Sequence, residues 1–85
     1  MSAVVIYTKS ACSYCHAAKD LLRQKGAAFE EISVDGDRAG QAAMAAKAGG
    51  RSTVPQIFIG AAHVGGCDDL YDLESAGRLD ALLAG

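Results

Sequence analysis

Two cysteines separated by two residues, Cys12 and Cys15, constrain this chain more than any other feature of its sequence. They follow an unbroken run of β-favouring residues, Val4 to Tyr7, which predicts a strand buried on both faces. They precede apolar residues at helical spacing, and this helix is expected to start at Cys12 and to stop at Gly26. The cysteine pair should therefore lie where a strand and a short loop pass into a helix.

The rest of the chain continues in strands and helices of one α/β order. Phe29 to Val34 alternates like a half-exposed strand, and the alanine-rich stretch from Arg38 to Ala48 favours a helix. Gln56 to Ile59 and Ala62 to Val64 predict two short strands around Gly60. A C-terminal helix is indicated by an apolar face of five leucines: Leu70, Leu73, Leu79, Leu82 and Leu83. The expected order is β-α-β-α-β-β-α in a single domain over residues 1–85.

Composition removes several classes of function. The 85 residues are 51% hydrophobic and 21% charged, which is unlike a disordered chain. The chain has eight basic and ten acidic residues and no basic block, so it lacks the positive surface that attracts a nucleic-acid backbone. Nucleic-acid binding is therefore not expected. Ala3 to Tyr7 is far shorter than the roughly 20 residues that span a bilayer. Three cysteines do not fit a disulfide-stapled secreted domain, so we expect a soluble, cytoplasmic protein in a reducing compartment.

The placement of the cysteine pair favours redox chemistry. Cys12 should lie near a helix N-terminus, with Cys15 about one turn further on, so a disulfide is possible. Unpaired amides and the helix dipole stabilise an anion there, which lowers a thiol pKa from about 8.5 toward or below neutrality. Cys12 is therefore the candidate nucleophile. Half of a zinc site is the alternative, but the sequence lacks a second Cys-x-x-Cys or a His pair to complete it.

Two later segments could bind a ligand. In Thr53-Val54-Pro55 a cis X-Pro bond would turn the preceding backbone outward, although the residues alone favour an ordinary trans proline that opens a strand. In Gly65 to Asp69, glycines allow close backbone approach, helix-start amides can bind a carboxylate and an aspartate can hold an ammonium group. The alternative is a glycine turn followed by an aspartate N-cap. Cys67 is expected to be a buried or bystander thiol.

Four segments together resemble the dithiol glutaredoxins of the small bacterial type, over essentially the whole chain. They are Tyr7-Thr8-Lys9, Cys12-Ser13-Tyr14-Cys15-His16, Thr53-Val54-Pro55-Gln56-Ile57-Phe58-Ile59-Gly60 and Gly65-Gly66-Cys67-Asp68-Asp69-Leu70. The resemblance implies a thioredoxin fold with a mixed four-stranded sheet flanked by helices. It also implies that the bond before Pro55 is cis.

The resemblance further implies roles for single residues. Cys12 corresponds to the nucleophile, Cys15 to the resolving thiol and Tyr14 to a residue beside bound glutathione. The backbones of Thr53 and Val54 would pair with the cysteinyl part of glutathione. In full, the implied glutathione-binding residues are Lys9, Tyr14, Gln41, Arg51, Thr53, Val54, Pro55, Gly66, Cys67, Asp68 and Asp69.

These binding residues divide by the part of glutathione that they would contact. Cys67 and Asp68 would hold the γ-glutamyl end, with Asp69 in support. Lys9 would lie near the thiolate and the glycyl carboxylate, and Gln41 and Arg51 near that carboxylate as well. A solvated lysine and ordinary surface residues are the alternatives for these three. The histidines, His16 and His63, are expected to be solvated or packed.

The implied function is a glutathione-dependent thiol-disulfide oxidoreductase, with glutathione as co-substrate, that reduces protein–glutathione mixed disulfides and protein disulfides. No metal is required, and the protein is expected to be a monomer. Ser13 stands where many members have proline, and members with serine include some that share a [2Fe-2S] cluster between two copies. A glutathione-ligated cluster carrier using Cys12 is therefore the first alternative. A thioredoxin-like donor served by a flavin reductase is the second, and Lys9 and the loop from Gly66 to Asp69 stand against it.

Overall fold

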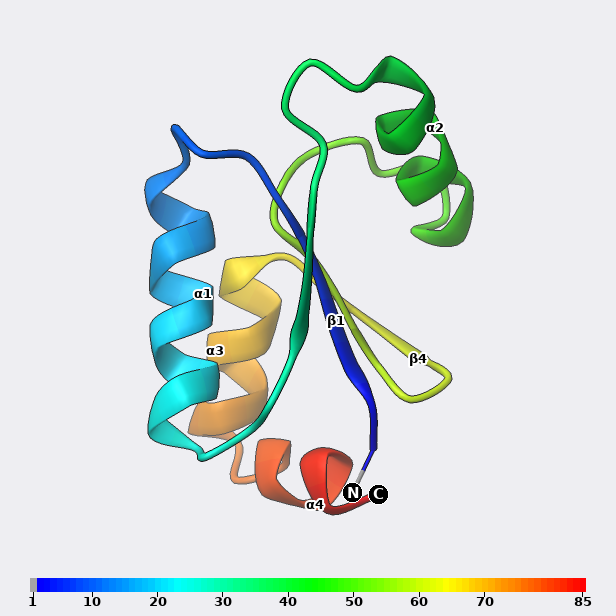
Figure 1. Cartoon of the computed structure of the whole chain (residues 1–85). Helices are drawn as coiled ribbons and strands as arrows, with labels where there is room; N and C mark the ends of the chain where they lie inside the picture. The colour runs from blue at the N-terminus through cyan, green and yellow to red at the C-terminus, as the bar shows by residue number, and fades with distance from the viewer. Residues whose placement is uncertain (1) are drawn as a thin grey trace.

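The computed structural model describes residues 2–85. They form four strands and four helices (Figure 1). In chain order these are β1 (Val4–Thr8), α1 (Ser13–Gln24), β2 (Glu30–Ser33), α2 (Arg38–Lys47), β3 (Gln56–Ile59), β4 (Ala62–Gly65), α3 (Cys67–Ser75) and α4 (Leu79–Ala84). Within residues 2–85 no helix has the length and apolar character that crossing a membrane demands.

The four strands make one mixed sheet in the order β2-β1-β3-β4. β1 runs parallel to β2 and antiparallel to β3, and β3 and β4 form an antiparallel hairpin. Helices α1 and α3 cover one face of the sheet and α2 covers part of the other (Figure 1). This is the mixed, helix-flanked sheet that the resemblance implies.

A separate hydrophobic cluster fills each face of the sheet. The larger cluster joins the sheet to α1, α3 and α4, and its fully buried members include Ile6, Leu22, Ile57 and Leu70. The smaller one lies toward α2 and is built on Tyr7, Val34 and Met44. β1 contributes Ile6 to one cluster and Tyr7 to the other, so its prediction as a strand buried on both faces is confirmed. Met44 is the one residue of α2 that is buried.

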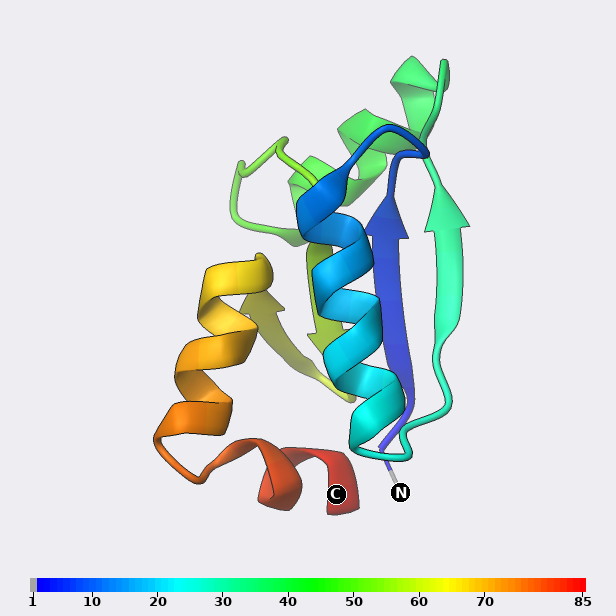
Figure 2. The same ribbon diagram turned by 90° about the vertical axis from the view of Figure 1, so that its left-hand side faces the viewer.

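The C-terminal segment differs from the expectation of one helix. α3 ends at Ser75, and α4 begins separately at Leu79. Gly77 has a φ of +71°, a left-handed conformation that suits glycine and turns the chain. The turn brings Leu79 and Leu83 into the larger cluster and sets α4 across the end of the fold, beside the first residues of the chain (Figure 2).

Candidate active site

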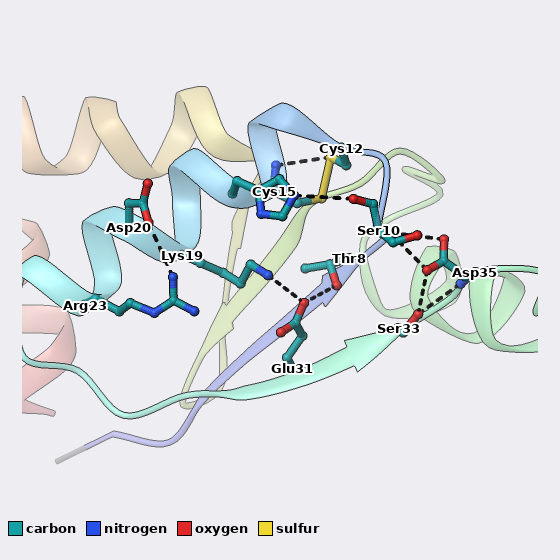
Figure 3. Close-up of polar contacts among 11 residues, drawn as sticks. Thr8, Ser10, Cys12, Cys15, Lys19, Asp20, Arg23, Glu31, Ser33 and Asp35 are labelled. Atoms are coloured by element: carbon teal, nitrogen blue, oxygen red, sulfur yellow. Dashed lines mark hydrogen bonds and ion pairs between the residues drawn. A yellow bond between two sulfur atoms is a disulfide. The ribbon is translucent and has the colours of Figure 1, made fainter.

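Cys12 lies between β1 and α1 and is the N-cap of the helix. Its backbone is extended, with φ −140° and ψ 103°, and its Sγ accepts a hydrogen bond of 3.1 Å from the backbone N–H of Cys15. The helix therefore begins at Ser13, one residue later than expected. Cys12 and Cys15 form a disulfide whose Cα atoms are 5.2 Å apart, within the ordinary range for such a bond (Figure 3).

The two cysteines are not equally accessible. Cys15 is fully buried in the first turn of α1, whereas Cys12 is only partly buried. The first turn of α1 carries no acidic residue, so nothing within that turn opposes the positive end of the helix dipole. The arrangement offers an incoming disulfide the sulfur of Cys12 and supplies backbone donors to the negative charge that it would carry.

The loop before Cys12 is fastened to the end of β2. The backbone N–H of Ser10 donates to both carboxylate oxygens of Asp35, at 3.1 and 3.0 Å, and the hydroxyl of Ser33 donates to one of them (Figure 3). Hydrogen bonds from Ser10 hold the pKa of Asp35 below its usual value, and the charge of Lys9 adds to this effect. Asp35 thus anchors the loop as a carboxylate, a role that the sequence did not indicate.

A cleft of about 140 Å³ adjoins the disulfide. The Sγ of Cys12 lies 3.9 Å from the carbonyl oxygen of Val54, which lines the cleft. All of the lining residues were among the eleven that the resemblance implied: Tyr14, Arg51, Thr53, Val54, Pro55, Gly66, Cys67, Asp68 and Asp69. Three segments that lie far apart in the sequence therefore meet beside the partly buried Cys12.

The bond between Val54 and Pro55 is cis. The resemblance implied this conformation, whereas the residues alone favoured a trans bond. Pro55 is buried and directly precedes β3, so the proline does stand at the start of a strand.

The start of α3 forms another part of the cleft wall. Gly66 is the N-cap, and its backbone N–H donates to Asp69 Oδ2 at 2.8 Å. Arg51 Nη1 lies 3.1 Å from the same oxygen. The Gly66 N–H, and then Arg51, hold the pKa of Asp69 below its usual value. The alternative of an aspartate N-cap is thus wrong, because the carboxylate reaches back from the third position of the helix. Gly65 has a φ of +114°, and a Cβ there would collide with Asp69 and Arg51.

Two of the implied residues do not line the cleft. Lys9 lies partly buried in the loop after β1. Gln41 on α2 uses its side-chain amide to donate to the carbonyl oxygen of Ser52 at 2.7 Å. It therefore braces the loop that carries Thr53 from outside the cleft.

Cys67 is a free thiol in the wall of the cleft. It is buried, as expected, and burial raises its pKa, with the charge of Asp68 adding to the shift. The thiol therefore stays protonated near neutral pH. Among residues 2–85, no three side chains of the kinds that ligate metals gather in one place.

Two polar networks near the site were not predicted. Thr8, at the end of β1, donates from its hydroxyl to Glu31 at 2.6 Å, and Lys19 lies 3.0 Å from the same oxygen (Figure 3). Gln56 contacts both His63 and Thr53. The second network could be expected only from the register of the β3–β4 hairpin, because Gln56 and His63 are seven positions apart in the sequence.

Comparisons with known proteins agree with this architecture. The family model described as Glutaredoxin matches residues 4–64. The chain is 57% identical over 83 residues to Glutaredoxin 3 of Escherichia coli K12, covering 98% of this chain and 99% of that protein. It is 58% identical over 84 residues to a glutaredoxin of Pseudomonas aeruginosa, covering 99% of each.

Solved structures give the same result for the fold. A crystal structure of a buckwheat glutaredoxin–glutathione complex matches with a TM-score of 0.87 at 36% identity, over 98% of this chain and 77% of that one. The solution structure of glutaredoxin from Brucella melitensis matches with a TM-score of 0.86 at 54% identity, over 98% of this chain and 89% of that one. The sheet and its helices form the expected thioredoxin fold.

Proposed function

The chain belongs to the glutaredoxin family, and on this premise we propose that it reduces protein–glutathione mixed disulfides and protein disulfides at the expense of glutathione. Its family and its cysteine pair make it a thiol oxidoreductase. The dependence on glutathione rests on one observation above all. A cleft lined by the residues of three separate segments opens beside Cys12, the more accessible sulfur of the pair.

The reaction with a glutathionylated protein needs only Cys12. Its thiolate attacks the glutathione sulfur, a new disulfide forms between Cys12 and glutathione, and the protein leaves as a thiolate that takes a proton from water. The thiolate of a second glutathione then attacks the glutathionyl sulfur. Glutathione disulfide leaves and the Cys12 thiolate is restored. The first turn of α1 supports both steps, because the Cys15 N–H stands within hydrogen-bond distance of this sulfur.

The reaction with a protein disulfide also needs Cys15. Cys12 attacks one protein sulfur and forms a mixed disulfide, and the other protein sulfur leaves as a thiolate. Cys15 then attacks the Cys12 sulfur, which releases the second protein thiol and forms the Cys12–Cys15 disulfide of this structure. Two glutathiones reduce that bond and leave as glutathione disulfide. The Cα separation of 5.2 Å allows the pair to close.

The walls of the cleft suit the two ends of glutathione. The free amides at the start of α3 can bind the γ-glutamyl carboxylate, and the exposed Asp68 can hold its ammonium group. Arg51, which pairs with Asp69 at the start of α3, can attract the glycyl carboxylate. Thr53 and Val54 also line the cleft, and the carbonyl oxygen of Val54 lies next to Cys12. Lys9 and Gln41 act from outside the cleft in this proposal.

The proposal is tested by asking which reductant supplies electrons to the protein. The purified protein is supplied with a glutathionylated peptide and NADPH, and either with glutathione plus glutathione reductase or with thioredoxin reductase. We expect NADPH consumption only in the glutathione arm, and none with Cys12→Ser. Turnover with thioredoxin reductase and none with glutathione would reject the proposal in favour of a thioredoxin-like donor. Size-exclusion chromatography of the same sample tests the further proposal that the active protein is a monomer. We also propose that the protein works in the cytoplasm.

A glutathione-ligated iron–sulfur carrier is the second candidate. Ser13 is the first residue of α1, directly after Cys12. A serine does not fix the backbone φ at this position, whereas a proline would. A solved structure titled "Metal Binding of Glutaredoxins" is 53% identical to this chain with a TM-score of 0.74. In this second proposal the cluster would be shared by two copies of the chain, with Cys12 of each copy and two glutathiones as its ligands.

A further inference from the structure

Gln56 is a fully buried polar side chain between the hairpin and the cleft. Its Oε1 lies 2.8 Å from His63 Nε2, and its Nε2 donates to Thr53 Oγ1 at 3.3 Å. A buried amide needs partners for both ends, since an unpaired buried polar group destabilises the fold. Here the two partners come from different segments, one on β4 and the other in the wall of the cleft.

His63 is held in place by the hairpin. It pairs with Phe58 in the register of β3 and β4, and its ring stacks on the Phe58 ring with the centroids 5.0 Å apart. Gln56 and Phe58 are two residues apart on β3, so their side chains leave the strand on the same side. Tyr7 packs edge-on against Phe58 at 5.8 Å. His63 is an exposed residue, and its imidazole packs on Phe58 at the point where it reaches the Gln56 amide.

The amide of Gln56 points its two ends at different partners. Gln56 Nε2 donates to Thr53 Oγ1, and Oε1 faces His63 Nε2, a nitrogen that donates in the Nε2–H tautomer. Thr53 Oγ1 then uses a lone pair for Gln56 and keeps its own O–H to donate elsewhere. A reversed amide would accept from the Thr53 O–H and would need His63 Nε2 as an acceptor, so the Nε2–H tautomer of His63 favours the orientation in this structure.

We infer that His63 is a positioning residue: through Gln56 it holds the Thr53 hydroxyl as a hydrogen-bond donor to an oxygen atom of glutathione in the cleft. Thr53 lines the cleft, whereas His63 lies outside it. The inference rests on the proposed function, and it predicts that His63 affects the preference for glutathione without affecting sulfur exchange itself.

The test compares two substrates that differ only in the group on the disulfide. One is a glutathionylated peptide, and the other is the same peptide in disulfide linkage to cysteamine, which lacks the γ-glutamyl and glycyl parts. His63→Phe keeps a ring on Phe58 and removes the N–H donor, and Thr53→Val removes the hydroxyl at nearly constant shape. We expect each to raise KM for the glutathionylated peptide about three- to tenfold, with kcat unchanged. For His63→Phe, both parameters for the cysteamine peptide should stay at the wild-type values.

Further variants separate positioning from structure. Thr53→Ser keeps the hydroxyl and should restore the wild-type KM. His63→Phe combined with Thr53→Val should be no worse than Thr53→Val alone, because both act on one hydroxyl. An unchanged KM in His63→Phe, additive effects in the double variant, or equal losses with both peptides would overturn the inference and leave the proposed function intact. A wild-type protein that does not distinguish the two peptides would overturn the proposed function as well.

Discussion

The backbone N–H of Cys15 donates a hydrogen bond of 3.1 Å to the Sγ of Cys12, while the sulfur of Cys15 itself lies fully buried. The first turn of the helix thus buries one cysteine and offers a backbone donor to the other. This asymmetry predicts that the two cysteines have different roles, although their spacing in the sequence alone does not distinguish them.

The asymmetry predicts unequal effects of removing each sulfur. Cys12→Ser should abolish all turnover, since the attacking sulfur is gone. Cys15→Ser should still remove glutathione from a glutathionylated peptide but should lose reduction of protein disulfides, which needs a second thiol. Both reactions are followed through NADPH and glutathione reductase. Equal loss of deglutathionylation in the two variants would contradict the assignment of Cys12 as the nucleophile.

The reactivity of Cys12 with an alkylating reagent should extend to low pH. The amides at the start of α1 favour the thiolate, and no acidic residue in the first turn opposes it. In reduced protein with Cys15→Ser, the iodoacetamide rate plotted against pH should have its midpoint well below about 8.5, the free-thiol value. Lys9→Glu should move the midpoint upward if the cation contributes, and Lys47→Glu on α2 serves as the matched charge control. A midpoint at or above the free-thiol value would remove the electrostatic argument.

Cys67 should behave in the opposite way. Burial and Asp68 raise the pKa of its thiol, so little thiolate exists at pH 7 and the reagent cannot easily reach the sulfur. With Cys12→Ser and Cys15→Ser combined, mass spectrometry should show no labelling of the folded protein during the minutes that label Cys12 in the Cys15→Ser variant. The same protein in denaturant should be labelled fully. Rapid labelling of folded Cys67 would show that the thiol is not protected.

The contact between Glu31 and Thr8 predicts how stability depends on pH. The Thr8 hydroxyl, and then Lys19, lower the pKa of Glu31 in the folded protein below its ordinary value of 4.5. The unfolded state therefore takes up the proton first as pH falls. The stabilisation is complete above about pH 5 and is lost as pH falls through the folded pKa.

Glu31→Gln removes the charge and tests this linkage. At pH 7 it should lower the free energy of unfolding by about 0.5–1 kcal/mol, a value kept small because the Glu31 side chain is 39% exposed and solvent screens the ion pair with Lys19. Urea unfolding at pH 7 and pH 3.5 provides the measurement. The difference between wild type and variant should shrink at the lower pH, and a difference that grows on acidification would reverse the sign of the argument. Asp20→Asn, in an exposed pair with Arg23, is the control with little expected effect.

The parts of this fold that depend on local pattern could be predicted from the sequence. The apolar run in β1 and the alanines of α2 identify their own elements, and β3 has the predicted bounds. The break between α3 and α4 was missed, although in one continuous helix Leu79, Leu82 and Leu83 would lie on the side opposite to Leu70 and Leu73. Gly77, with its positive φ, lies in the turn.

The site was harder to predict wherever it depends on contacts between distant segments. Its cysteines are recognisable by their spacing, but the ion pair of Arg51 with Asp69 and the anchoring of Ser10 by Asp35 join residues 18 and 25 positions apart. The cis bond before Pro55 became an expectation only through the resemblance, since base rates favour trans.

Ser13 provides the test of the second candidate function. Proline is well tolerated at the first position of a helix, because the N–H that it lacks has no partner within the helix. Ser13→Pro should therefore keep the fold and the reductase reaction, while it fixes φ directly after Cys12. Anaerobic reconstitution of the wild type with iron, sulfide and glutathione, followed by absorption spectroscopy and sizing, should give a coloured dimer if Cys12 can turn toward a cluster shared by two copies. A colourless monomer would reject cluster binding, and a coloured dimer that forms equally well with Ser13→Pro would show that Ser13 is not its cause.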